Sequence, residues 1–119
     1  MTRLWKILAA AAACALLVTP AMADDYSVVT AIKQNCANEW PDDYRMQASC
    51  FKQNAEALAW LSDRLPEIKA AGADQPPSRI LAACMDKWVE GDGHEWTMVK
   101  YCWTTQMQAY RAIQALPGN

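Results

Sequence analysis

The chain has 119 residues, which is the size of one domain and leaves no room for two. It carries 11 Lys and Arg against 13 Asp and Glu, so its formal net charge is −2, and 53% of its residues are hydrophobic. Nucleic acids and anionic membrane surfaces bind proteins through clustered positive charge. The composition therefore argues against both as partners and describes a small domain with one apolar core.

Residues 1–23 have the three parts of a secretory signal peptide. Arg3 and Lys6 form the positive region, residues 7–18 form the apolar region, and the segment ends in Ala-Met-Ala, a small-residue cleavage site. The apolar run is shorter than the ~20 residues that cross a membrane. We therefore expect a mature chain of residues 24–119 that is periplasmic or secreted, with no stable membrane insertion after cleavage. Loss of the two leader cations would lower the net charge from −2 to about −4.

Two halves of the mature chain repeat the same rare residue types in the same order. The first block aligns Ile32-x3-Cys36-x3-Trp40 with Ile80-x3-Cys84-x3-Trp88, without a gap. After four extra residues in the second half, the next block aligns Asp43-Tyr44-x-Met46-x3-Cys50-Phe51 with Glu95-Trp96-x-Met98-x3-Cys102-Trp103. We interpret the match as an internal duplication. It predicts two repeat units, about residues 26–65 and 78–115, joined by a connector that contains Pro and Gly.

Each unit reads as two helices joined by a turn, because apolar residues recur at helical spacing and strand signals are absent. In the first unit, Pro41 suits the first position of the second helix, and Pro66 should end or kink that helix. In the second unit, Asp92 and Glu95 have the spacing of a capping box that would start the last helix. We predict an all-α fold in which two repeated, disulfide-stapled helical hairpins form a four-helix bundle-like domain.

Four cysteines remain after the leader is removed: Cys36, Cys50, Cys84 and Cys102. An even number of cysteines in an exported chain favours two structural disulfides, and four cysteines allow three pairings. The repeat favours bonds within each unit, Cys36 to Cys50 and Cys84 to Cys102. The fifth cysteine, Cys14, lies in the leader, and its acylation is a less favoured alternative because Ala11 stands where lipoprotein signals carry Leu.

A metal site is one alternative for the second unit. His94, Met98 and Cys102 have the spacing i, i+4, i+8, which would place them on one helix face. Imidazole, thioether and thiolate together suit Cu(I). However, an oxidised cysteine is no metal ligand, and the first unit has Asp42 where the second has His94. We therefore expect no metal and no other cofactor, and keep periplasmic Cu(I) binding through these three residues as an alternative.

No residue pattern in the chain indicates a reaction. The one histidine, His94, lies in the predicted capping segment, where a solvent-facing role is more common than a catalytic one. The cysteine spacings are C-x13-C and C-x17-C, unlike the C-x2-C of thiol redox sites. We expect a non-enzymatic protein without catalytic residues.

Tryptophan is frequent, with six in the chain, five of them after the leader. Trp40 and Trp88 recur beside the turns of both units, whereas Trp60 has no counterpart. Exposed tryptophans are common in protein interfaces. Trp60 is therefore our first choice as a contact residue, with burial in the core as the alternative.

The segment Cys36-Ala-Asn-Glu-Trp40-Pro-Asp-Asp-Tyr44-Arg-Met46-Gln-Ala-Ser-Cys50 resembles a motif of small exported bacterial proteins, mostly proteobacterial. The motif has the form C-x3-W-P-x-[DN]-[YF]-x-M-x3-C. It covers about one sixth of the mature chain and matches the second unit more weakly, since Trp96 stands there in place of Tyr. That group has no assigned activity, so the resemblance implies a signal-bearing helical module and carries over no catalytic residue.

These observations favour an exported, non-enzymatic helical module that binds a protein or a cell-envelope component through aromatic surface. An alternative of another class is an acid- or stress-responsive holdase chaperone. In that alternative, the carboxylates of a small acidic domain are protonated at low pH, and the loosened helices expose their apolar faces.

Overall fold

The computed structural model describes residues 26–118, so the predicted leader and Cys14 lie outside the described residues. The chain comprises two compact units, Met1–Thr30 and Ala31–Asn119. The described part of the first unit, residues 26–30, is helical. The second unit holds both disulfides and the apolar core.

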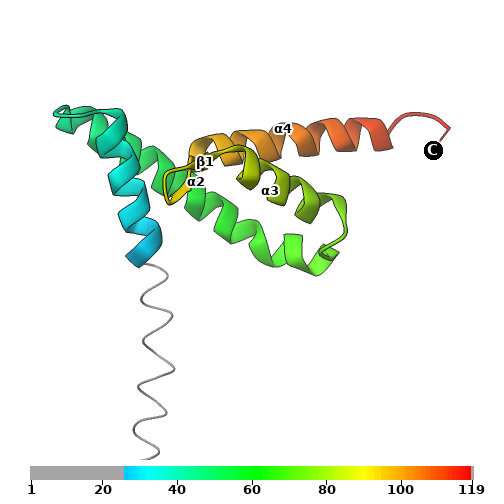
Figure 1. The fold of residues 1–119 in the computed structure, drawn as a ribbon. Coiled ribbons are helices and arrows are strands. Elements are labelled where there is room, and N and C mark those ends of the chain that lie inside the picture. Colours follow the sequence, from blue (N-terminus) through cyan, green and yellow to red (C-terminus); the bar gives the residue numbers. More distant parts are fainter. Residues whose placement is uncertain (1–25, 119) are drawn as a thin grey trace, which may run out of the picture. The chain divides into compact units, whose positions relative to one another are not determined.

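The second unit is mostly helical (Figure 1). It begins with a helix over residues 31–39, called the opening helix below. The elements that follow are α2 (Tyr44–Ala71), α3 (Pro76–Lys87), β1 (Val89–Glu90), β2 (Gly93–His94) and α4 (Trp96–Gln114). The all-α class is confirmed. The antiparallel β1–β2 hairpin was not expected, because strands of two residues are too short to show an alternating pattern.

The start of α2 differs from the prediction. Asp43 is the N-cap, and its side chain accepts a hydrogen bond from the amide of Met46 at 3.1 Å. Pro41 and Asp42 form the preceding turn, in which Asp42 has a positive φ of 61°. The expectation that Pro41 occupies the first helical position is wrong, because the carboxylate of Asp43 satisfies a free amide of the first turn.

The end of α2 also differs, since the helix continues through Pro66 to Ala71. Proline lacks a backbone donor, which leaves the carbonyl oxygen of Ser62 without its helical partner. Ser62 and Pro66 are both exposed, so water can satisfy that oxygen. Of the two outcomes expected at Pro66, an end or a kink of the helix, the end is therefore wrong.

The start of α4 is fixed by a residue of α2. Glu95 is the N-cap of α4 but makes no side-chain capping bond, and Asp92 lies in the hairpin turn, so the predicted capping box is wrong. The amide of Trp96 donates instead to Oδ1 of Asn54 at 2.8 Å. Asn54 is only 8% exposed. A buried side chain 42 positions earlier thus provides the cap, which no local sequence pattern reveals.

The apolar core lies where α4 packs on both α2 and α3. Its buried members come from all three helices: Leu61, Ile68, Cys84, Val99, Trp103 and Met107. The buried indole of Trp103 has a partner, because its Nε1 donates to the carbonyl oxygen of Pro77 at 3.1 Å. Burial of a Leu, Val or Met side chain contributes roughly 1.5–3 kcal/mol, so this cluster holds the three helices together.

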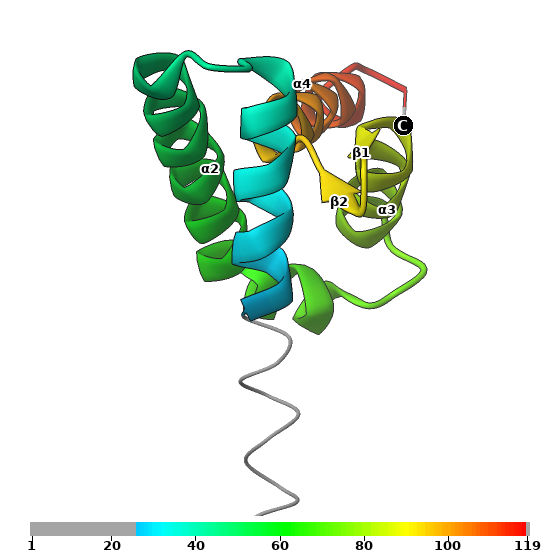
Figure 2. The same ribbon diagram turned by 60° about the vertical axis from the view of Figure 1, so that its left-hand side comes forward.

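The hairpin is held against the opening helix by Asn35. The Nδ2 group of Asn35 donates to the carbonyl oxygen of Glu90 at 2.8 Å. In the hairpin turn, Gly91 has a φ of 55°, and a Cβ at this position would lie 2.5 Å from Oδ1 of Asn35. Only glycine fits both the conformation and the close approach. Figure 2 shows the hairpin between the opening helix and α3.

Two disulfides join consecutive helices. Cys36–Cys50 links the opening helix to α2, and Cys84–Cys102 links α3 to α4, with 5.7 Å between the Cα atoms in each pair. The predicted pairing is confirmed. In the chain-entropy model, a crosslink that closes a loop of about 15 residues contributes about 3 kcal/mol, a large part of the stability of a small domain.

Candidate functional site

Trp60, the predicted contact residue, lies on α2 and is half-buried. Its ring packs edge to face against that of Trp103 on α4, with 5.9 Å between the ring centroids and 68° between the planes. Such pairs add about 0.5–1.5 kcal/mol beyond the area that they bury. The structure thus places Trp60 at the margin of the core, and its role as a contact residue stays a prediction.

Two cations lie over the Trp60 ring. The Cζ atom of Arg64 is 3.5 Å from the ring centroid, and the Nζ atom of Lys100, on α4, is 4.9 Å from it. Nη1 of Arg64 also donates to the carbonyl oxygen of Trp60 at 3.0 Å, which fixes the guanidinium in this place. Cation–π contacts at partly exposed sites contribute about 0.5–1 kcal/mol. The aromatic pair therefore gathers positive charge where α2 meets α4.

A cavity of about 210 Å³, called the Trp60 cavity below, opens beside this ring pair. Its lining combines apolar side chains with charged ones: Ile68, Trp103 and Met107 with Arg64, Glu67 and Arg111. The volume of the cavity is below the roughly 300–1,000 Å³ of small-molecule sites. The dimensions fit an anchoring point for a partner better than a cofactor site.

A second cavity, of about 190 Å³, lies between the end of the opening helix, α2 and the start of α4, and Glu39 and Glu95 line it. Burial raises the pKa of Glu90, and the negative charge of Glu39 raises this pKa further. Burial also raises the pKa of Glu95, as do the charges of Glu90 and Glu39, while the Met98 amide and the Thr97 hydroxyl oppose the rise. Three carboxylates from three segments, called the carboxylate cluster below, thus interact at this junction.

The alternative copper ligands are not arranged as expected. His94 lies in β2, ahead of α4, and its ring packs against that of Trp96 with 5.0 Å between centroids, so it does not share a helix face with Met98. Cys102 is bonded to Cys84, so its sulfur is no thiolate. Within residues 26–118, no group of three or more His, Cys, Asp or Glu side chains is placed to hold a metal ion. Cu(I) binding through these residues would require reduction of that disulfide.

The sequence reasoning identified Trp60 but missed the cations around it. Arg64 follows Trp60 by four positions, a spacing that puts both on one face of a helix. On α4, Lys100, Met107 and Arg111 share one stripe at i, i+7 and i+11. Both spacings are visible in the sequence. The contact of these particular faces of α2 and α4 is not, because it depends on the packing of the core.

No protein-family model, curated protein sequence or solved structure matches the chain.

Proposed function

We propose that the chain is an exported, non-enzymatic helical module, periplasmic or secreted, that binds a protein or a cell-envelope component. The sequence of residues 1–23 supports export, because it has the parts of a signal peptide. The two disulfides also support an oxidising compartment, since cytosolic thiols are kept reduced. Among the helices of residues 26–118, none has both the length and the apolar character needed to span a bilayer.

The binding role rests on the Trp60 cavity. Tryptophan and arginine are enriched among the residues that dominate binding energy in interfaces. Here Trp60, Arg64 and Arg111 surround a recess that is large enough for one partner side chain. A side chain seated in it would contact apolar groups and hydrogen-bond donors at once, which is how small recesses anchor a partner.

The internal duplication belongs to the same proposal. Each half contains a helix, a disulfide and a second helix, and the four extra residues of the second half fall in the β1–β2 hairpin. The matched methionines Met46 and Met98 line the same cavity beside the carboxylate cluster. We infer two hairpins of one plan, packed as a four-helix bundle-like domain. If the two units arose by duplication, the part of α2 that lines the Trp60 cavity has since acquired the binding role proposed here.

The carboxylate cluster supports the binding module over the acid-activated holdase. A domain that loosens at low pH needs carboxyl groups whose pKa is lower in the folded state than in the unfolded state. Glu90 and Glu95 have raised pKa values, so their protonation favours the folded state. Protonation of the carboxylate cluster at low pH would therefore stabilise this junction rather than loosen it.

Site-specific photocrosslinking in the exporting cells tests the proposed function. A photoreactive residue replacing Glu67, which is exposed at the Trp60 cavity, should give a discrete adduct with the partner. The Trp60→Ala variant should lose this adduct, provided that circular dichroism shows it folded. Glu56 is the matched control, because it is also exposed on α2 but lies outside the cavity lining. Equal adducts at both positions, or adducts that persist in Trp60→Ala, would contradict the proposal.

A further inference from the structure

We propose that the Trp60 cavity takes a glutamate or aspartate side chain from an acidic peptide segment of the partner. This inference rests on the proposed binding function and names the chemistry of the partner. Arg64 and Arg111 line the cavity and Lys100 lies over the ring of Trp60, although the chain as a whole has a net charge of −2. The charge of this surface is therefore opposite to that of the protein.

The three cations have no ion-pair partner among residues 26–118. Arg64 donates one of its five N–H groups to the carbonyl oxygen of Trp60. An arginine fork binds a carboxylate through two parallel hydrogen bonds, which sets both distance and orientation. Arg111 lines the same cavity from α4. Arginines from two helices thus line the cavity that would hold the carboxylate.

The apolar part of the lining fits the rest of such a side chain. Ile68, Trp103 and Met107 are all buried and present apolar surface to the cavity. The methylene groups of Glu or Asp match this surface, and the carboxylate matches the arginines. Cofactor-sized ligands need a cavity of roughly 300–1,000 Å³, larger than the 210 Å³ found here. The site is therefore suited to a short acidic side chain.

The negative charge of Glu67 allows a test of whether electrostatic attraction governs binding at the cavity. It lines the cavity, is exposed on α2 and carries the charge that would repel an incoming carboxylate. The proposal therefore predicts opposite effects for neighbouring charge removals. Loss of Arg64 or Arg111 should weaken binding of an acidic peptide, whereas loss of Glu67 should strengthen it.

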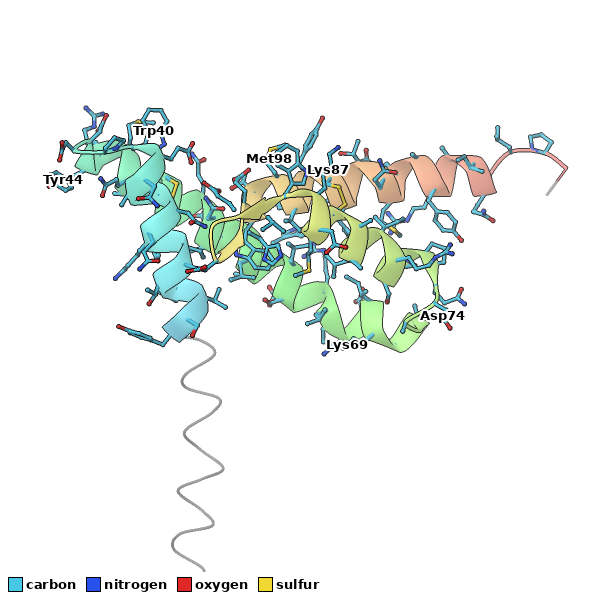
Figure 3. The ribbon with its side chains drawn as sticks, in the orientation of Figure 1. Trp40, Tyr44, Lys69, Asp74, Lys87 and Met98 are labelled. Atoms are coloured by element: carbon cyan, nitrogen blue, oxygen red, sulfur yellow. A yellow bond between two sulfur atoms is a disulfide. The ribbon has the colours of Figure 1, made fainter. Side chains whose placement is uncertain are left out.

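The test measures binding of two fluorescein-labelled peptides to the oxidised, exported protein by fluorescence anisotropy at low salt. Tetraglutamate is the probe, and tetraglutamine is its neutral counterpart. We expect tetraglutamate to bind at least about tenfold more tightly, and Arg64→Gln and Arg111→Gln each to weaken it by about tenfold, as for loss of a hydrogen bond to a charged group. Glu67→Gln should strengthen it. Lys69→Gln should leave it unchanged, because Lys69 is exposed on the side of α2 turned away from α4 (Figure 3).

Equal binding of the two peptides, or binding of tetraglutamate that neither arginine variant weakens, would overturn the inference. Thermal unfolding of each variant separates a binding defect from misfolding, and the exposed Arg111 is the change least able to disturb the core. Binding to phosphatidylglycerol vesicles without binding to tetraglutamate would assign the cations to a membrane and would also overturn it. If tetraglutamate fails while Trp60-dependent crosslinks persist in cells, this inference falls and the proposed function stands. If those crosslinks are absent too, both fall.

Discussion

Two regions of the second unit gather like charges, and the fold treats them in opposite ways. At the Trp60 cavity, Arg64 and Lys100 lie over the electron-rich face of Trp60, which stabilises their positive charge. In the carboxylate cluster, Glu90 and Glu95 are partly withdrawn from water beside a third carboxylate, which disfavours their negative charge. The first region is therefore a cationic surface stabilised by its contacts. In the second region, burial and repulsion between the carboxylates slightly destabilise the folded state.

The difference follows from what each charge contacts. A cation over an aromatic ring is attracted to the ring quadrupole and can still donate hydrogen bonds outward. A carboxylate near other carboxylates loses hydration and meets repulsion, and the position of Glu95 at the positive N-terminus of α4 offsets only part of this. The cations at the Trp60 cavity can therefore bind an external anion. In the carboxylate cluster, protonation reduces the repulsion between the negative charges.

The largest expected effect comes from removal of the Cys84–Cys102 disulfide, because α4 supplies residues to both regions. Cys84→Ala with Cys102→Ala should lower the free energy of unfolding by about 3 kcal/mol, measured by urea denaturation. Tetraglutamate binding should be lost with it. Cys36→Ala with Cys50→Ala is the matched control. It should cost a similar amount of stability yet retain peptide binding, because the opening helix contributes no residue to the Trp60 cavity. Equal loss of binding in both variants would show that the two regions are not separable.

A smaller effect is expected for Asn54→Ala, which removes the cap of α4 and leaves the amide of Trp96 without its partner. Loss of a buried hydrogen bond costs about 1–3 kcal/mol, so the midpoint of thermal unfolding should fall. The neighbouring Gln53→Ala, at an exposed position, should change stability by less than about 0.5 kcal/mol. If the two variants have the same stability, Asn54 does not fix the start of α4.

The cation–π contact should contribute less than the cap. Arg64→Met keeps much of the side-chain volume but removes the charge over Trp60 and the hydrogen bond to its carbonyl oxygen. We expect a loss of about 0.5–1 kcal/mol in urea denaturation, together with a change in tryptophan fluorescence. Arg45→Met is the control, since Arg45 is exposed on α2. An unchanged stability of Arg64→Met would mean that the ring does not hold the guanidinium.

The smallest expected effect is the pH dependence of the carboxylate cluster. Burial and neighbouring carboxylates raise the folded-state pKa of Glu90 and Glu95 above the ordinary value of 4.5. Their contribution to stability is therefore fully present below that ordinary value and is lost as the pH rises through the raised pKa values. Because both groups are partly exposed, the change should be only about a few tenths of a kcal/mol.

The measurement is the difference in unfolding free energy between the parent and the double variant Glu90→Gln, Glu95→Gln, followed from neutral to acidic pH. This difference cancels the titration of all other groups that the substitutions leave unchanged. The variant should be more stable than the parent at neutral pH, and its advantage should shrink as the pH falls. An advantage that grows toward acidic pH would reverse the assigned sign and would reopen the holdase alternative.

The sequence allowed prediction of the helical class and of both disulfides, because cysteine order and helical spacing are local or periodic signals. The boundaries of α2 and α4 were missed for a different reason. Asp43 replaced Pro41 as the start of α2 through a competing cap, and Asn54 capped α4 from another helix. At the site, Trp60 was found by its lack of a repeat counterpart. Its contact with Lys100 depends on how α4 packs on α2, which the sequence alone does not specify.

The connectivity of the disulfides has a consequence for biogenesis. In the second unit the first cysteine is bonded to the second and the third to the fourth, with sequence separations of 14 and 18. Domains fold as the chain is delivered from its N-terminus, so in an exported chain the cysteines meet an oxidant in this same order. An enzyme that joins each cysteine to its predecessor as it emerges would make both native bonds directly. If the chain is exported as proposed, its maturation should therefore require a thiol oxidase but no disulfide isomerase.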